Sequence, residues 1–290
     1  MLPLILTILC SLSISLLLTL NEKRRGDRMV AAAANYGVAA LLGLVMAKGR
    51  IDLPPEWLGA SLLIGAGFVA GFLLLMRSIR SVGLAVTGSV ARIASLGPVL
   101  LSILFYNEQP SGTAWIGIGL GVVAFLLLGL GSRGRPAVEQ DDAPVELSAA
   151  LLLLAVVVVM TANDFAMKVA QVNGLDSGSV LAVVFAGAAS LCGVMLWARR
   201  GSLWEMSPFA GRDLLLGALL GVPNFFSSYF LVAALHALPA STVFPIVSAG
   251  GVVLAALAGL LLWKERPSAL AWLGIGLAAV AVGLLGMESS

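Results

Sequence analysis

The 290-residue chain carries too little charge for a water-soluble protein. Residues of the set AVILMFWYC make up 60% of it and charged residues only 11%, whereas a soluble domain carries about a quarter charged residues. Even a soluble fold of this length buries only about three quarters of its surface, so lipid must solvate the rest. The net charge is +2 and no basic stripe occurs, so no nucleic-acid partner is expected.

The usage of cysteine and histidine excludes a metal centre and a disulfide framework. Cys10 and Cys192 lie inside apolar runs and are expected to be small buried hydrophobes. The single histidine, His236, is expected at the surface in a short connection. No GxxxxGK[ST] loop is present, so no ATP site and no cofactor are expected.

Ten windows of the chain are long and apolar enough to cross a bilayer. They lie near residues 3–22, 29–47, 57–76, 83–105, 112–131, 147–168, 177–197, 213–235, 239–262 and 269–286. We expect helices throughout, because lipid offers the backbone no hydrogen-bond partners. The basic cluster Lys23 to Arg28 follows the first window, the reverse of a cleavable signal peptide. The first window is therefore predicted to be a retained span.

An internal repeat divides the chain at a charged connection, residues 132–146. Residues 106–120 read YNEQPSGTAWIGIGL and residues 263–277 read WKERPSALAWLGIGL, with nine of the fifteen positions identical at an offset of 157. A weaker echo links Thr19–Glu22 to Thr161–Asp164. We therefore predict one five-helix repeat over residues 1–131 and a second over residues 147–290.

An odd number of helices in each repeat makes the two halves enter the membrane from opposite sides. The predicted fold is therefore all-α and integral to the membrane, with ten transmembrane helices in two inverted-topology five-helix repeats. Inverted repeats are a transporter architecture in which substrate binds near the membrane midplane between the repeats. Alternating access follows when one repeat rocks against the other.

The repeated motif Glu-x-Pro-Ser-x-x-x-Trp-x-Gly-Ile-Gly-Leu follows the fourth and the ninth span. At this motif the chain resembles the drug/metabolite transporter superfamily, and within it the EamA-type ten-helix members. A proline in each preceding helix, Pro98 and Pro245, carries the resemblance through both halves. The resemblance implies a secondary transporter or exporter of metabolites that has no ATP site, with both termini inside the cell.

The motif also has a physical interpretation. Pro110 and Pro267 suit the first turn of the following helix, where the missing N–H is harmless. Glu108 and Glu265 lie near helix N-termini, which favour a carboxylate, and are interpreted as structural caps rather than coupling residues. Close helix packing in lipid is predicted at the paired glycines, Gly117, Gly119, Gly274 and Gly276.

Arg92 lies near the middle of the fourth span, and its repeat counterpart is Ala249. Ionisable groups inside a span are costly and usually functional. One interpretation is that the guanidinium binds a substrate carboxylate or phosphate. The other is a structural ion pair with Asp164, and the two arrangements could alternate during a transport cycle.

Asp164 and Lys168 lie one helical turn apart near the end of the sixth span, with Asn163 adjacent. An i,i+4 ion pair at the membrane surface is one interpretation. The other is a coupling site in which protonation of Asp164 drives exchange, with Asn163 and Lys168 beside it.

The eighth span contains a polar stretch behind Pro223, which is expected to kink the helix. Asn224, Ser228 and Tyr229 are predicted to line a substrate cavity, and hydrogen bonding of the serine to its own helix is the alternative. Asn35 and Tyr36 in the second span form a similar, weaker candidate.

The positive-inside rule conflicts with the resemblance over orientation. Of the 17 basic residues, 13 lie in odd-numbered connections, which places these connections in the cytoplasm and both termini outside. The resemblance implies termini inside, so the orientation stays open.

The leading functional hypothesis is a secondary transporter in a bacterial inner membrane. It would export a small metabolite, amino-acid-like compound or drug, anionic or zwitterionic to suit Arg92, with possible proton coupling. The alternative is a flippase for a lipid or lipid-linked headgroup, where Arg92 would meet phosphate. A membrane protease is disfavoured, because Asp176-Ser177-Gly178-Ser179 lacks the first glycine of GxSG and one histidine cannot supply HExxH. No catalytic residue is therefore expected.

Overall fold

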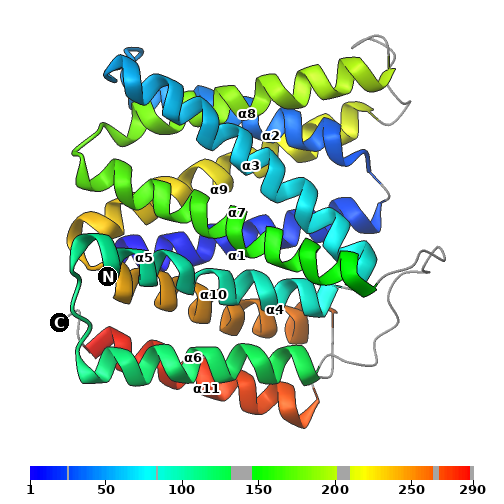
Figure 1. Cartoon of the computed structure of the whole chain (residues 1–290). Helices are drawn as coiled ribbons and strands as arrows, with labels where there is room; N and C mark the ends of the chain where they lie inside the picture. Colours follow the sequence, from blue (N-terminus) through cyan, green and yellow to red (C-terminus); the bar gives the residue numbers. More distant parts are fainter. Residues whose placement is uncertain (25, 83, 132–145, 201–209, 264–267, 288–290) are drawn as a thin grey trace. The chain divides into compact units, whose positions relative to one another are not determined.

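The computed structural model describes the chain except residues 25, 83, 132–145, 201–209, 264–267 and 288–290 (Figure 1). The described residues form helices and no strands. The helices are α1 (Leu2–Lys23), α2 (Arg28–Met46), α3 (Pro55–Val82), α4 (Leu84–Ala94), α5 (Leu96–Tyr106), α6 (Gly112–Gly131), α7 (Glu146–Val172), α8 (Ser177–Arg200), α9 (Ala210–Ala237), α10 (Ala240–Trp263) and α11 (Ala269–Met287). The predicted linker, residues 132–146, falls almost entirely outside the described residues.

The described helices account for all ten predicted spans. Nine stretches are long and apolar enough to cross a membrane, and Val86–Tyr106 is one of them although it contains two helices, α4 and α5. The tenth is the shorter apolar stretch Gly112–Leu128 of α6. The chain is thus an all-α integral membrane protein, as its composition requires.

The fourth span is broken at Ser95, where one continuous helix was predicted. Pro98 has no N–H to donate to the carbonyl of Ala94, four residues earlier. The hydroxyl of Thr161 in α7 donates to that carbonyl instead, at 3.1 Å. Gly97 allows this approach, because a Cβ there would collide with the Thr161 side chain. A proline and a threonine on another helix together explain the break.

The chain divides into two compact units, and both predicted repeats contribute helices to each. The α2–α8 unit comprises Leu2–Val69 and Val169–Ala233. The α6–α11 unit comprises Met1, Ala70–Lys168 and Ala234–Ser290. The boundaries fall inside α3, α7 and α9, so the compact units are not the sequence repeats.

In the α6–α11 unit, α6 and α11 lie side by side (Figure 1). A Cβ on Gly117 would lie 2.7 Å from Leu285 Cγ, and one on Gly274 would lie 2.9 Å from the carbonyl oxygen of Ala124. The prediction of close packing is confirmed for these two glycines, which are 157 positions apart. It is wrong for the second glycine of each motif, because Gly119 and Gly276 have open space around them.

The motif serines begin the two helices of this pair. The Ser111 hydroxyl accepts the N–H of Ala114 at 3.1 Å, and the Ser268 hydroxyl accepts that of Ala271 at 3.2 Å. Each serine therefore satisfies an N–H group that the first helical turn leaves without a partner. Pro110 precedes this cap and does not lie in the first turn of α6, so its predicted place is wrong. Pro267 lies outside the described residues.

In the α2–α8 unit, α2 and α8 pack closely around small residues. A Cβ on Gly43 would lie 2.6 Å from Ala182 Cα, so the two backbones approach more closely than larger residues would permit. Phe185 of α8 is fully buried and its ring contacts those of Tyr36 and Phe68, with centroids 6.1 and 5.6 Å away. An aromatic cluster forms the core of this unit.

Candidate functional site

The predicted site residues are divided between the two units. The α2–α8 unit holds Asn35, Tyr36, Asn224, Ser228 and Tyr229, and the α6–α11 unit holds Arg92, Asn163, Asp164 and Lys168.

Asn35 and Asn224 hydrogen-bond to each other and join α2 to α9. The amide of Asn224 donates to Asn35 Oδ1 at 3.1 Å, and Asn35 is buried. Gly221, one turn earlier in α9, lies so close that a Cβ would be 2.6 Å from the carbonyl oxygen of Asn35. Inside a membrane such a bond satisfies two polar groups that lipid would leave without partners.

Tyr36 and Ser228 are both engaged within the protein. The hydroxyl of Tyr36 donates to the carbonyl of Phe68 at 3.4 Å, and its side chain is buried. The hydroxyl of Ser228 donates to the carbonyl of Asn224 in its own helix at 3.3 Å, as the structural alternative predicted. α9 continues through Pro223 as one helix.

Tyr229 is half-buried and stacks on Phe225 of the same helix, with ring centroids 5.7 Å apart. Within the described chain, no hydrogen bond involves the Tyr229 hydroxyl. It is therefore the member of this group best able to donate to a ligand.

An apolar hollow of about 580 Å³ lies between α1 and α9. The hydroxyls of Ser11 and Ser227, 3.1 Å apart, join the same two helices. The hollow is lined by Cys10, Ser13, Leu17, Leu219, Val222, Pro223, Phe226 and Phe230. Such a lining suits a hydrocarbon chain better than a charged solute.

Arg92 is half-buried in α4, and its guanidinium lies against α10. A Cβ on Gly251 would be 3.0 Å from Arg92 Nη1, so the absence of a side chain there makes room for the cation. No ion pair or side-chain hydrogen bond of Arg92 occurs among the described residues, and none joins it to Asp164. The structural-pair interpretation is therefore not supported in this conformation.

Asp164 and Asn163 lie in α7 and are both half-buried. Asn163 is near α3, where a Cβ on Gly71 would lie 3.6 Å from its side-chain nitrogen. Within the part of the chain that the structure describes, the Asp164 carboxylate makes no hydrogen bond or ion pair. The predicted i,i+4 pair with Lys168 is wrong, because the lysine points to a different carboxylate.

That carboxylate belongs to Glu108 in the connection between α5 and α6. Lys168 Nζ lies 3.1 Å from Glu108 Oε1. The carboxylate also accepts the backbone N–H groups of Ala240 and Ser241, both at 3.0 Å. Glu108 is a helix cap as predicted, although it caps α10 and not its own following helix. Its repeat counterpart, Glu265, lies outside the described residues.

The order of the spans allows Glu108 and Lys168 to meet. Residue spacing along a single helix does not reveal this possibility. The connections that follow α5, α7 and α9 are all even-numbered and lie on one membrane face. Glu108 lies in the first of these connections, and Lys168, of opposite charge, lies in the last turns of α7 just before the second. Such a pair can form across connections of the same face, whereas connections on opposite faces cannot meet.

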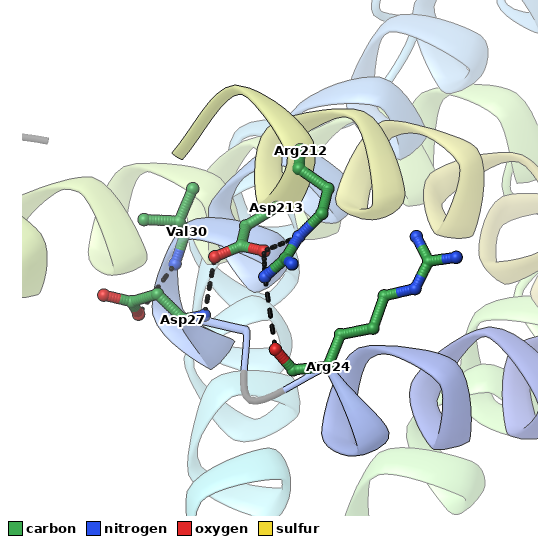
Figure 2. Close-up of polar contacts among 5 residues, drawn as sticks. All are labelled: Arg24, Asp27, Val30, Arg212 and Asp213. Atoms are coloured by element: carbon green, nitrogen blue, oxygen red, sulfur yellow. Dashed lines mark hydrogen bonds and ion pairs between the residues drawn. The ribbon is translucent and has the colours of Figure 1, made fainter. Parts of the chain in front are cut away.

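A second polar cluster fixes the α1–α2 connection in the α2–α8 unit (Figure 2). Asp213 of α9 is buried and accepts the backbone N–H of Asp27 at 2.8 Å. Arg212 donates both to Asp213 at 3.1 Å and to the carbonyl of Arg24 at 3.3 Å. The Asp27 side chain in turn accepts the N–H of Val30 at 3.4 Å and caps α2. Because its groups bond to one another, the cluster is interpreted as structural.

Two comparisons place the chain among known proteins. An uncharacterized protein of Haemophilus influenzae is 26% identical over 287 residues, which cover 94% of this chain and 93% of that protein. A protein of known crystal structure shares the fold, with a TM-score of 0.77 at 17% identity over 99% of this chain and 96% of that one.

The family comparison is more specific, and it follows the internal repeat. Residues 1–130 and residues 147–287 each match the model of the EamA-like transporter family. The two matched stretches are separated by the charged connection in the middle of the chain, and together they include all ten spans. The chain therefore belongs to the EamA-like transporter family.

Proposed function

We propose that this protein is a secondary transporter that exports a small anionic or zwitterionic solute, such as a metabolite, an amino-acid-like compound or a drug. We place it in a bacterial inner membrane, where alternating access between the inverted repeats would carry solute across. Membership of a transporter family and ten apolar spans support this proposal.

The observation that carries the proposed substrate class is the environment of Arg92. A cation inside the membrane is costly unless an anion offsets it, and no described carboxylate pairs with this one. A substrate carboxylate or phosphate would supply the missing charge through charge-assisted hydrogen bonds to the guanidinium. The arginine would thus select for acids and zwitterions.

The remaining predicted residues receive subsidiary roles in this proposal. Asp164 would bind and release the proton that couples transport, with Asn163 beside it. Asn224, Ser228 and Tyr229 would line the substrate path, and Asn35 and Tyr36 would hold α2 and α9 in place behind them. Lys168 would contribute to coupling through its ion pair with Glu108.

Replacement of Arg92 tests the substrate class. Arg92→Gln is expected to lower proteoliposome transport of an acid by at least about tenfold, the loss of one charged contact, while the protein still folds and inserts. Arg77→Gln is the matched control, because Arg77 is exposed in α3 of the same unit. Equal transport by the parent and Arg92→Gln would remove the arginine from the substrate site.

The second candidate function is a lipid-headgroup flippase, which the apolar hollow between α1 and α9 favours. That hollow suits an acyl chain, and Arg92 would then meet a headgroup phosphate. Movement of fluorescent phospholipids between leaflets, without transport of any soluble acid, would support this candidate over the first.

A further inference from the structure

Three separate segments of the α6–α11 unit meet at the carboxylate of Glu108. We propose that Glu108, Lys168 and the first turn of α10 form a gate, the Glu108 clasp, which closes one membrane face in this conformation and opens during transport. This inference rests on the proposed transport function and adds to it the residues that control access.

The clasp combines a largely buried ion pair with the N-terminus of a helix. The side chains of Lys168 and Glu108 are only 8% and 12% exposed. The carboxylate is held by one ammonium group and by two backbone N–H groups at the positive end of α10. Removing one partner of a buried pair leaves an uncompensated charge, so the closed arrangement depends on both.

The turn at the end of α5 fixes the backbone position of Glu108. Asn107 ends α5 in the left-handed conformation, with φ 52°, and its N–H bonds to the carbonyl of Ser102. Asparagine adopts this conformation more readily than most residues. The carboxylate therefore projects from a defined backbone position and not from a free loop.

The location of the clasp is what makes it a gate. It joins the α5–α6 connection, the last turns of α7 and the first turn of α10. These three segments are expected at the same membrane face, because the fourth, sixth and eighth spans all end there. Alternating access requires that each face can be sealed and reopened. α7 also carries Asp164 one turn before Lys168, so a movement of α7 that opens the clasp also moves the proposed proton site.

Thiol labelling reports the opening of the clasp without any substrate. The reporter is Ala240→Cys in a Cys10→Ala/Cys192→Ala background, since Ala240 is fully buried and bonds to Glu108. Glu108→Gln and Lys168→Met are each expected to raise the rate of reaction with a charged thiol reagent by at least about tenfold, because they break a buried pair.

The control reporter is Ala124→Cys, which is fully buried in α6 of the same unit. It is expected to stay unreactive in both variants, which shows that the unit remains folded. Unchanged labelling at Ala240→Cys, or an equal rise at Ala124→Cys, would overturn the clasp.

The last experiment separates a gate from a static cap. The labelling rate of Ala240→Cys in otherwise parental protein is measured in proteoliposomes at rest and while they transport an acid. It is expected to change at least about threefold as the open state becomes populated, and an unchanged rate contradicts a gate. Because labelling of the variants needs no substrate, failure of every solute to move would count against the proposed function and not against the clasp.

Discussion

At the scale of single residues, Gly251 decides where the Arg92 guanidinium lies. Gly251→Ala would place a Cβ 3.0 Å from Arg92 Nη1, and the flexible arginine would move aside at a stability cost under about 1 kcal/mol. We expect a changed KM for a transported acid with little change in Tm. Gly88→Ala in α4 is the control, because a Cβ there meets open space. An unchanged KM would mean that the position of the guanidinium does not matter.

The sequence placed polar residues within spans but could not show which partner each would find. Asn35 and Asn224 were predicted as ligand contacts, and the structure shows them bonded to each other. One interpretation paired Lys168 with Asp164 along its own helix, whereas the lysine pairs with Glu108 in the α5–α6 connection. Helical spacing reveals neighbours on one helix only, so partners on other helices stay hidden until the fold is known.

At the scale of helices, the pairing of α6 with α11 depends on one glycine in each motif. Gly274→Ala would put a Cβ 2.9 Å from the backbone oxygen of Ala124, which cannot yield without moving a helix. We expect a loss of about 1–3 kcal/mol in stability, the usual cost of overpacking, measured as a lower Tm in detergent. Gly276→Ala, where a Cβ meets nothing, should leave Tm unchanged or slightly higher. Equal Tm values for the two variants would contradict this packing.

The number of spans and their helical character were predictable, because a span needs only length and apolar composition. The break at Ser95 was not, because it depends on Thr161 donating to the Ala94 carbonyl, a contact across 67 positions. The same limit applies to the motif glycines, since identical local sequence cannot show that Gly117 packs against α11 while Gly119 faces open space.

At the scale of the whole molecule, the sequence repeats and the compact units divide the chain at different positions. The repeat at offset 157 agrees with the two family matches, residues 1–130 and 147–287. The compact units combine helices from both halves, and this mixing could not be inferred from similarity between segments. The repeat was therefore readable from the sequence, whereas the grouping of helices into compact units was not.

Transport by the purified protein tests whether the chain is a proton-coupled transporter of acids or zwitterions. Proteoliposomes would be offered a panel of acids, zwitterions and neutral solutes, with and without an imposed pH gradient. We predict that one acid or zwitterion accumulates, that the gradient increases its accumulation, and that Asp164→Asn abolishes this dependence while leaving the protein folded. Accumulation of neutral solutes alone, or movement of lipids without any solute, would contradict proton-coupled transport of an acid or zwitterion.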